Sequence, residues 1–424
     1  MKVLSKLNVL HLLEFSLPKI AGYSIRTHNI LIFQKKLISP IALVDPNNIR
    51  GKKPYILDGI SYYKYPPFLG YNLINNSKIL HLLKFSQAYN IIYNYLVENQ
   101  KKFIKDFVNS KKIDLIHAHS PSKSAKIGCY VAKNKKIPFI YEVRGFIEDT
   151  KVGLGKWTEK SLKYRKRRKK ETELMKRADA VITLGKAMKK EIQNRGINEN
   201  KIFIVPNGVD TQKFVPEPID ENLKMKLNLQ QVKLIGYVGS IRKIEGLEIL
   251  LKAFYFLEKK IKNIKIIIVG PVRPETYLIS LKSYIRKLKI ENNVIFTGKV
   301  SYEDIKKYYS IIDVFVLPRL DTRVNRIVTP LKPLEVMALG KLLLASDLPA
   351  LKELVIPKVT GDLFEPENSK MLANKLEYYL RNLDKIDELK NNAREWVLKN
   401  FDWSEVVKRY IPIYEELIKK SQYS

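Results

Sequence analysis

The sequence predicts an α/β protein with two domains, each built around a doubly wound and mostly parallel sheet. The chain has 424 residues, which is more than one ordinary core accommodates. Short apolar runs without period-two alternation recur along it, as is typical of strands buried on both faces. Segments with helical spacing of apolar residues separate these runs. Successive strands are therefore expected to be joined by right-handed helical crossovers.

The first half of the chain holds several apolar runs that we expect to be strands. They are VLHLLEF at 9–15, DLIHAHS at 114–120, PFIYEVRG at 138–145, ADAVITL at 178–184 and KIFIVP at 201–206. Helical patterns occupy 156–177 and 185–194. The segment PNGVDTQKFVPEP (206–218) then breaks the alternation with the turn signal Asn207-Gly208 and further prolines. We therefore place the end of an N-terminal domain at residue 206.

The second half repeats the pattern and predicts a C-terminal domain at 207–400. Its expected strands are 232–240, 264–270, 293–298, 313–318 and 341–346. Residues 401–424 have helical spacing, and we expect this segment to pack back on the N-terminal domain. Two similar α/β domains that face each other form a central cleft. Ligands of open α/β sheets bind at the carboxyl ends of the strands, so the cleft is the expected site.

Charge is the unusual feature of the composition. Lys and Arg total 77 against 43 acidic residues, a net charge of +34. This balance favours anionic partners such as nucleic acid, phosphorylated ligands or an anionic membrane, and it serves solubility equally well. The single cysteine, Cys129, excludes a disulfide scaffold and fits a cytoplasmic protein. No apolar run approaches the ~18 residues of a membrane helix, and 9–15 is interpreted as a strand rather than a signal peptide.

The stretch RVNRIVTPLKPLEVMALGK (323–341) lies between two expected strands and concentrates polar residues there. Pro333 suits the first turn of a helix and Gly340 its end, with Leu334, Met337 and Ala338 facing inward. The preceding loop would then present backbone N–H groups to a phosphate, aided by nearby cations. The residues expected around the phosphate are Thr329, Pro330, Leu331, Lys332, Arg323 and Arg326.

Glu335 occupies the first turn of this predicted helix. A carboxylate there can accept hydrogen bonds from the vicinal hydroxyls of a ribose. It can equally serve the helix dipole, since acidic residues are common in first turns.

Several polar residues of the first half follow expected strands. Gly22 suits a loop that approaches a phosphate, or a simple turn. His117 and His119 share one strand face, and we expect them near the cleft rather than only in structural hydrogen bonds. Arg144 ends the next strand and can bind a phosphate or a sugar hydroxyl.

Four further polar residues have two interpretations each. Arg26 and His28 either line the cleft or lie on a solvated helix face. Glu148 and Asp149 either orient an acceptor or serve loop solubility.

An ordered set of motifs carries a resemblance that covers nearly the whole chain. The motifs are PKIAGYSIRTHNIL (18–31), IHAHSP (116–121), YEVRGFIED (141–149), RADAVITLGKAMKKEI (177–192), VPNGVD (205–210), YVGSIRKIEGLEILLKAF (237–254), VTPLKPLEVMALGKLLLAS (328–346) and GDLFEP (361–366). Their order and spacing resemble glycosyltransferase family 4, the group 1 glycosyltransferases of the GT-B fold. The subset with VTPLKPLE, YEVRGF and GYSIRT is most similar to the branch linked to surface polysaccharide assembly.

The resemblance implies roles for individual residues and also shows departures from the family. Glu335 matches the second glutamate of an E-x7-E motif, which binds the nucleotide ribose. The first glutamate, which contacts the donor sugar, is replaced by Ile327. An arginine and a lysine that hold the diphosphate are replaced by Ser240 and Glu245. Because a diphosphate leaving group needs cations, we expect compensation from Arg242, Lys243, Arg323, Arg326 and Lys332, with Gly22, Ser240 and Gly298 also at the donor site.

The activity that the resemblance implies is retaining transfer from a UDP- or GDP-linked sugar. The acceptor would be a glycan or polyprenyl-linked glycan at the cytoplasmic membrane face, and the family generally works without a metal. His119, Arg144 and Lys332 are the expected catalytic residues. Three alternatives remain: a degenerate nucleotide-sugar-binding protein, a nucleotide-sugar epimerase, and a nucleic-acid-binding protein, which lacks support from any RNA-binding or zinc-finger motif.

The run KWTEKSLKYRKRRKK at 156–170 is the one dense cluster of Lys and Arg. With Trp157, Leu162 and Tyr164 interleaved, it is expected to form a basic helix that lies on an anionic membrane. A solvated helix face is the alternative.

Overall fold

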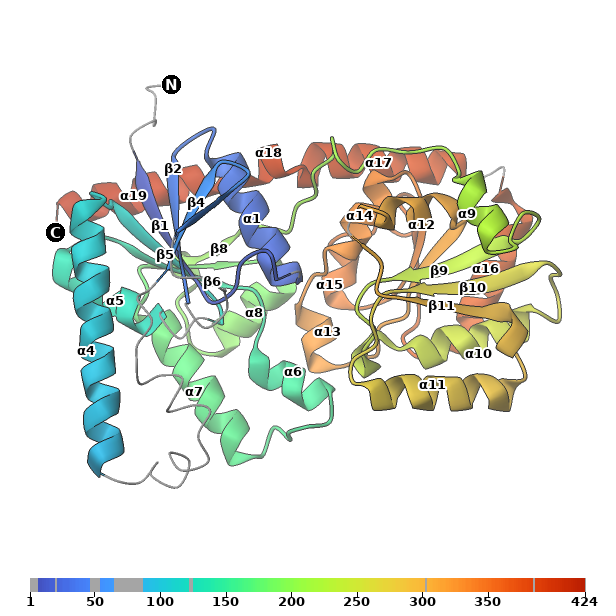
Figure 1. The fold of residues 1–424 in the computed structure, drawn as a ribbon, viewed down its shortest axis with the longest axis horizontal. Coiled ribbons are helices and arrows are strands. Elements are labelled where there is room, and N and C mark those ends of the chain that lie inside the picture. Colours follow the sequence, from blue (N-terminus) through green and yellow to red (C-terminus); the bar gives the residue numbers. More distant parts are fainter. Residues whose placement is uncertain are drawn as a thin grey trace.

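Two α/β lobes lie side by side in the computed structural model, and the last helices run back from the second lobe to the first (Figure 1). The structure describes residues 7–19, 21–45, 54–64, 87–121, 125–301, 303–383 and 386–423. Ile20, within the motif at 18–31, lies outside the described residues.

The N-terminal lobe contains a sheet that, within the described residues, has eight strands in the order β3-β4-β2-β1-β5-β6-β7-β8. All neighbours pair in parallel except β3 with β4. The strands are β1 (Asn8–Leu13), β2 (Ser39–Val44), β3 (Tyr55–Leu57), β4 (Ile60–Lys64), β5 (Leu115–His119), β6 (Phe139–Val143), β7 (Ala180–Thr183) and β8 (Ile202–Ile204). The apolar runs that the sequence assigns to strands are β1 and β5 to β8, while β2 to β4 were not predicted.

Helices cover both faces of this sheet, as a doubly wound sheet requires. Their bounds are α1 (Gly22–Gln34), α4 (Gln87–Ser110), α5 (Ala125–Lys135), α6 (Ile147–Gly153), α7 (Leu162–Arg177), α8 (Lys186–Asn194) and the 3₁₀ turn η3 (Glu199–Lys201). Buried residues of α4, α5, α7 and α8 share one core with the sheet. Those of α1 share the opposite core with the C-terminal segment.

The C-terminal lobe has a six-stranded parallel sheet, again counted over the described chain, in the order β11-β10-β9-β12-β13-β14. Its strands are β9 (Lys233–Val238), β10 (Ile264–Val269), β11 (Val294–Gly298), β12 (Val314–Leu317), β13 (Leu342–Ser346) and β14 (Asp362–Phe364). Its helices are α9 (Glu221–Lys226), α10 (Leu247–Leu257), α11 (Glu275–Leu288), α12 (Ile305–Ile311), α13 (Arg323–Ile327), α14 (Lys332–Ala338), α15 (Pro349–Lys352), α16 (Ser369–Arg381) and α17 (Asp387–Phe401), with 3₁₀ turns η4 (Lys243–Glu245) and η5 (Glu291–Asn293).

The C-terminal segment returns to the N-terminal lobe as α18 (Trp403–Val406), η7 (Val407–Arg409) and α19 (Tyr410–Gln422). Trp403, Tyr410 and Tyr414 are fully buried against α1 and the first sheet. The segment therefore closes the second core of the N-terminal lobe, where burial of large aromatic rings contributes strongly to stability.

Loops at the carboxyl ends of the two sheets face each other. A methyl group placed on Gly22, after β1, would lie 3.7 Å from Leu331. One placed on Gly145, after β6, would lie 3.5 Å from Val328. The carboxyl-end loops of both parallel sheets therefore meet at the predicted cleft.

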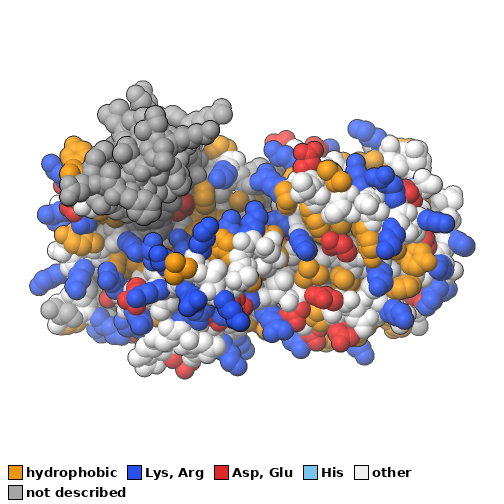
Figure 2. All heavy atoms as spheres, turned by 90° about the horizontal axis from the view of Figure 1, so that it is seen from below, with side chains coloured by type: hydrophobic (Ala, Val, Ile, Leu, Met, Phe, Trp, Pro, Cys, Tyr) orange, Lys and Arg blue, Asp and Glu red, His pale blue; other side chains and the backbone are white. Residues whose placement is uncertain are grey.

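Two surface features bear on the composition. Lys and Arg side chains are spread over both lobes on the face shown in Figure 2, interspersed with acidic residues. Among the described helices, none combines the length and the hydropathy that a bilayer crossing requires.

Candidate functional site

The stretch 323–341 folds into α13, a short loop and α14, which begins at Lys332. Leu334, Met337 and Ala338 are buried, as predicted, and Pro333 lies in the first turn. Gly340 follows the helix with a φ of 62°, the left-handed conformation that glycine adopts without strain. Because α14 packs inward on this face, its first turn presents Lys332 and Glu335 toward the loops at the end of the sheet.

Glu335 is half-buried, and its Oε2 accepts a hydrogen bond from the Tyr309 hydroxyl at 2.9 Å. Burial raises the pKa of this carboxyl above its usual value, although the Tyr309 bond and Lys332 oppose the rise. Oε1 accepts no hydrogen bond from the described residues. The carboxylate is therefore held by another side chain rather than by N–H groups of its own helix, which favours the ligand-binding interpretation over helix capping.

A cluster of charges lies beside the start of α14. Glu245 is buried, and its carboxylate lies 3.3 Å from Arg319 and 3.4 Å from Lys332, with Arg242 at 3.7 Å. Burial alone would raise the pKa of Glu245, but these three cations outweigh it and lower the pKa to about 2. The glutamate is therefore ionised, and the cluster keeps an excess of two positive charges that can attract a diphosphate.

Arg319 and Tyr237 also belong to this cluster, and neither was predicted from the sequence to lie there. Arg319 directly follows the strand run ending in Pro318, and its position after a strand was the available signal. Tyr237 accepts a hydrogen bond from Lys332 Nζ at 2.6 Å, and the ammonium also lies over its ring. The long Lys332 side chain is therefore fixed at both the ring and the Glu245 carboxylate.

Two glycines make this arrangement possible. Gly239 has a φ of 144°, and a methyl group there would collide with Lys332 Cε. Gly246 has a φ of 69°, and a methyl group there would collide with the Pro318 carbonyl oxygen. The loops after β9 and β12 therefore approach each other and Lys332 more closely than any side chain would allow.

The remaining predicted donor residues of the C-terminal lobe are more dispersed. Ser240 is exposed, and its carbonyl accepts a hydrogen bond from the Tyr237 hydroxyl at 3.2 Å. Lys243 is exposed in η4. Thr329 and Pro330 are buried in the loop before α14, next to half-buried Leu331. Gly298 lies at the exposed end of the edge strand β11.

Two predicted phosphate cations point elsewhere. Arg323 of α13 reaches across to the N-terminal lobe, where it pairs with Asp149 at 3.0 Å and with Glu191 at 2.6 Å. Arg326 is exposed and pairs with Asp321 of its own loop. Both guanidinium groups are therefore neutralised by carboxylates, whereas Lys332 and Arg242 lie together with Arg319 as a net positive group.

Ile327 stands where the resemblance expects a sugar-binding glutamate. It is buried and belongs to the apolar core of the N-terminal lobe. The side chain thus serves packing between the two lobes, and the position offers no polar group to a donor sugar.

On the N-terminal side, Glu142 at the end of β6 organises a buried polar network. Its carboxylate lies 3.0 Å from Arg26 Nε and 2.7 Å from Arg144 Nε, and it accepts a hydrogen bond from the Tyr410 hydroxyl at 2.7 Å. Burial would raise the pKa of Glu142, but Arg144 and Arg26, with His119, outweigh it and hold the pKa well below its usual value. Glu142 is therefore an ionised hub, which sequence reasoning missed.

Arg26 is buried rather than solvated, so the solvated-helix interpretation was wrong for it. Its guanidinium also donates to the carbonyls of Val205 and Pro206 and to Asn207 Oδ1. His28 is likewise buried and hydrogen-bonded, in this case to the hydroxyl of Tyr62. Both residues hold α1 in place instead of facing a ligand.

Arg144 is 8% exposed and largely committed to protein partners. Besides Glu142, it donates to the Tyr23 carbonyl at 3.1 Å and to the Thr27 hydroxyl. It also contacts His119 Nδ1. The geometry thus gives Arg144 a role in fixing α1 to β6, close to the cleft.

His11 of β1 and His117 and His119 of β5 form a stacked, fully buried group, of which His119 lies at the carboxyl end of its strand. His11 Nδ1 and His119 Nε2 are 2.9 Å apart. Burial lowers the pKa of all three imidazoles, most strongly for His11 and His119, so they are neutral near pH 7. Their ring nitrogens lie within 4.8 Å of one another, a spacing that a metal ion would fit.

The chemistry of the surroundings opposes a metal at these histidines. Both ring nitrogens of His119 already have protein partners, Arg144 and His11. The arginines at Glu142 add two positive charges beside the group, so a divalent cation would enter an electropositive and buried environment. We therefore treat the three histidines as part of the polar network around Glu142.

Glu148 and Asp149, expected either at the acceptor or in a solvated loop, begin α6 and are buried. Arg195 lies 2.8 Å from Glu148 and 3.3 Å from Asp149, and Asp149 also faces Arg323 of the other lobe. Neither expectation was correct. The two carboxylates belong to an ion-pair network that joins the lobes.

The predicted basic helix 156–170 is also revised. Residues 156–161 form no helix, and α7 begins at Leu162, with the Ser161 side chain accepting a hydrogen bond from the Tyr164 N–H. Tyr164 is buried and donates to Asp149, while Leu162 is 63% exposed. The charged face of α7 is therefore available, whereas Tyr164 is not available for insertion into a membrane.

Comparison with protein-family models gives two matches in chain order. Residues 75–213 match the model described as Glycosyltransferase Family 4, and residues 219–396 match the model described as Glycosyl transferases group 1. The first matched segment covers the later part of the N-terminal lobe, from α4 to β8, and the second lies in the C-terminal lobe.

Two curated relatives match most of the chain. The uncharacterized glycosyltransferase MJ1069 of Methanocaldococcus jannaschii is 26% identical over 344 residues, covering 78% of this chain and 83% of the relative. The capsular polysaccharide biosynthesis glycosyltransferase CapM of Staphylococcus aureus is 25% identical over 325 residues, covering 74% and 81%.

Solved structures share the fold. A glycosyltransferase from Rickettsia africae superposes with a TM-score of 0.75 at 19% identity, covering 98% of this chain and 99% of that one. Anabaena HepE in complex with UDP superposes with a TM-score of 0.72 at 18% identity, covering 97% and 100%. These neighbours establish the two-domain GT-B fold that the sequence predicts.

Proposed function

The chain belongs to the group 1 glycosyltransferases, and on that premise we propose that it transfers a sugar from a nucleotide-sugar donor to a hydroxyl of a glycan acceptor. The observation that carries the proposal is the pairing on α14. Glu335, whose Oε1 accepts no hydrogen bond within the described part of the chain, lies about one helical turn from Lys332, which belongs to the net positive cluster around Glu245. A ribose and a diphosphate are adjacent in every nucleotide sugar.

The donor would bind with its ribose hydroxyls on Glu335 and its diphosphate at Lys332, Arg319 and Arg242. Charged hydrogen bonds of this kind are about twice as strong as neutral ones. A UDP-linked donor is the first choice, because the neighbour HepE was solved in complex with UDP and with UDP-glucose.

Catalysis would be mainly electrostatic. As the bond between the anomeric carbon and the phosphate oxygen breaks, the electron pair leaves with the diphosphate, and the cationic cluster stabilises that charge. The acceptor oxygen then forms its bond to the anomeric carbon, and the hydroxyl proton passes to the departing phosphate oxygen, which has taken the electron pair. We propose attack on the face the diphosphate leaves, with retention of configuration and without a metal ion, as the family resemblance implies.

The acceptor would approach from the N-terminal lobe, past Gly22 and the loop after β6. A glycan or lipid-linked glycan of a surface polysaccharide is the proposed class, since CapM is named for capsular polysaccharide biosynthesis. Attraction of α7 to an anionic membrane, and a location at the cytoplasmic membrane face, stay predictions of the sequence.

A catalytically degenerate protein that binds a nucleotide sugar without transferring it is the second candidate. Ile327 favours it, because no carboxylate faces the donor sugar from that position. A glutamate placed there would lie in an apolar core, so Ile327→Glu is expected to destabilise the lobes rather than restore activity. An epimerase would convert the donor without any acceptor, so product analysis with acceptor omitted separates it from a transferase.

Thermal stabilisation by UDP, GDP and ADP provides the test, because a ligand that binds the folded state raises the melting temperature. The proposal expects one nucleotide to give a clear shift, and Glu335→Ala to abolish it. Glu221→Ala is the matched control, since Glu221 is an exposed first-turn glutamate of α9. A wild-type protein that responds to none of the three nucleotides at millimolar concentration would contradict the proposal. So would equal effects of the two substitutions.

A further inference from the structure

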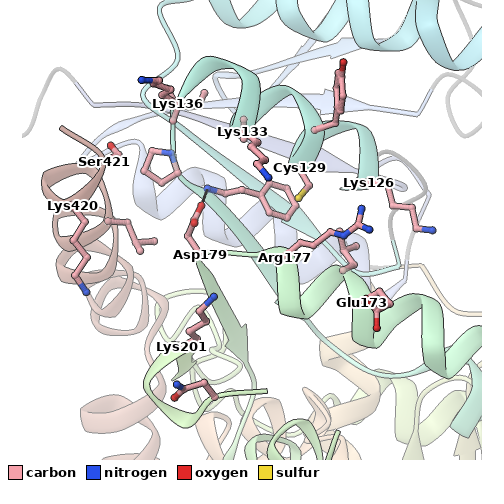
Figure 3. A pocket seen from close by; sticks show the side chains of 18 of the residues that line it. Lys126, Cys129, Lys133, Lys136, Glu173, Arg177, Asp179, Lys201, Lys420 and Ser421 are labelled. Carbon is pink, nitrogen blue, oxygen red and sulfur yellow. Dashed lines mark hydrogen bonds between the residues drawn. The ribbon is translucent and has the colours of Figure 1, made fainter. Parts of the chain in front are cut away.

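A large hollow lies in the N-terminal lobe, away from the cleft. It has a volume of about 1710 Å³ and is lined by residues of α5, α7, η3 and α19 (Figure 3). Residues that line it at 137–139, 177–179 and 198–203 come just before or at the start of β6, β7 and β8. The hollow is therefore at the amino ends of these parallel strands, whereas the cleft is at their carboxyl ends.

The lining is strongly basic. It contains nine Lys and Arg residues and three acidic ones. Two of the cations have protein partners: Lys420 pairs with Glu416, and Lys201 donates to the Ala178 carbonyl. The other seven have no ion pair with a carboxylate of the described residues, and they are Lys126, Lys133, Lys136, Lys166, Lys169, Lys170 and Arg177.

These unpaired cations converge from separate elements. Figure 3 shows Lys126 and Lys133 on α5 and Arg177 at the end of α7 among the residues around the hollow, with Lys420, which pairs with Glu416, on α19. The nearby carboxylate of Asp179 accepts the backbone N–H of Phe139 at 2.8 Å, so it is engaged with the protein. The unpaired cations repel one another, and an anionic ligand bound in the hollow would reduce this repulsion.

The rest of the lining is neither purely apolar nor purely charged. Leu174 and Leu417 are buried and Ile137 and Phe203 half-buried, which gives the hollow an apolar floor. The amide side chains of Asn134, Asn198 and Asn200 and the hydroxyl of Ser421 stand among the cations. Amides and hydroxyls recognise hydroxyl groups, and apolar surface packs against C–H faces of sugar rings.

We propose that this hollow binds an acidic glycan chain, an oligosaccharide that carries carboxylate or phosphate groups. The inference rests on the proposed function, in which the substrate is a glycan, and adds a second glycan-binding surface outside the catalytic cleft. Cations pair with the acid groups, asparagines with the hydroxyls, and the floor with the ring faces. A chain held there stays attached to the enzyme while its end enters and leaves the cleft.

Two other polyanions fit the lining less well. A planar anionic membrane touches the rim of a concave surface but not its floor. Single-stranded nucleic acid is held by rows of aromatic rings on which bases stack, and among the described lining residues Tyr130 is the one aromatic that is well exposed, at 49%. Charge, amides and apolar floor together match a glycan.

Binding of a galacturonate oligomer to the full chain tests the proposal, with a maltooligosaccharide of equal length as the neutral probe. In the variant of the hollow, called the groove variant, the substitutions are Lys133→Gln, Lys170→Gln and Arg177→Gln. The matched control carries Lys252→Gln, Lys282→Gln and Lys287→Gln on α10 and α11, with the same loss of charge. We expect saturable binding of the acidic oligomer that weakens by about tenfold or more in the groove variant and is unchanged in the control.

Three results would overturn the proposal. The first is equal weakening in both variants, which would mean binding to overall charge. The second is tighter binding of an oligonucleotide with the same number of charges. The third is loss of binding to phosphatidylglycerol vesicles in the groove variant while glycan binding persists. Thermal stabilisation by UDP, measured in parallel on the same variants, tests the proposed function separately. Where UDP still stabilises the groove variant, a loss of glycan binding reports a defect in the hollow and not in the fold or the nucleotide site.

Discussion

The role that the sequence predicts for Arg323 differs from the role that its contacts in the structure indicate. The sequence places it beside a diphosphate, whereas the structure pairs it with Asp149 and Glu191 of the other lobe. We therefore expect Arg323→Ala to weaken the junction between the lobes and to leave nucleotide binding intact.

The size of the effect follows from burial. The Arg323 side chain is 31% exposed, whereas those of Asp149 and Glu191 are 0% and 9% exposed. Removing one partner of a fully buried pair costs about 3–5 kcal/mol, and an exposed pair about 0–1 kcal/mol. Because Arg195 remains beside both carboxylates, we expect an intermediate loss of about 2 kcal/mol, or about 5 °C in melting temperature for a domain of this size.

The assay compares melting temperature and UDP affinity in three variants. Arg326→Ala is the matched control, because Arg326 lies on the same helix but is exposed and pairs within its own loop. Lys332→Ala tests the phosphate site, and loss of a charged contact there should weaken UDP by about tenfold or more. Arg323→Ala should change UDP affinity by less than about twofold. If Arg323→Ala weakens UDP as much as Lys332→Ala does, the reasoning is wrong and the sequence prediction stands.

Three further predictions concern the polar networks. Arg319→Ser should weaken UDP binding because it removes one cation of the cluster. Adding Glu245→Lys should recover much of the affinity, because it places a cation where the family resemblance expects a lysine. Calorimetry of the double variant that finds no recovery would refute this. For His11, burial lowers the folded pKa, so protonation favours the unfolded state as pH falls through about 6.5. Acidification from pH 7.5 to 5.5 should therefore lower the free energy of unfolding, and denaturant titrations of His11→Gln should show a shallower loss. Tyr309→Phe removes a hydrogen-bond donor to Glu335 and should raise the pKa of that carboxyl further. As the pH is lowered, the carboxylate of the variant should become protonated sooner, so UDP binding should be lost at a higher pH than in the wild type. A pH profile of UDP binding that does not shift would contradict this prediction.

Features set by local sequence were predictable. Strands such as β10 and β12 are unbroken apolar runs because both faces of a parallel sheet are buried. Helix α14 followed from Pro333 at its start and Gly340 after its end. Strands β3 and β4 were missed because they are short, lie at the sheet edge and mix polar with apolar residues.

Partners distant in sequence were not predictable from one chain. Arg26 resembles a solvated helix residue until Glu142 and Tyr410, far along the chain, are brought beside it. Asp149 resembles a loop acid until Arg323 arrives from the other lobe. In each case the sequence showed a charged residue, while the fold determined whether its partner was a ligand or another side chain.

The same distinction bears on the proposed donor site, which lacks the two cations that the resemblance places there and would bind a diphosphate through others. Glu245 would be a repulsive substitution by itself, since a carboxylate there opposes an anionic ligand. The carboxylate instead fixes Arg319 and Lys332, with Arg242 nearby, so one negative charge orders three positive ones. The net charge of the cluster stays positive, and in the proposed complex the cations would lose less conformational entropy because protein contacts already hold them. The position of a charge in such a site therefore matters less than the net charge and the rigidity of the group to which it belongs.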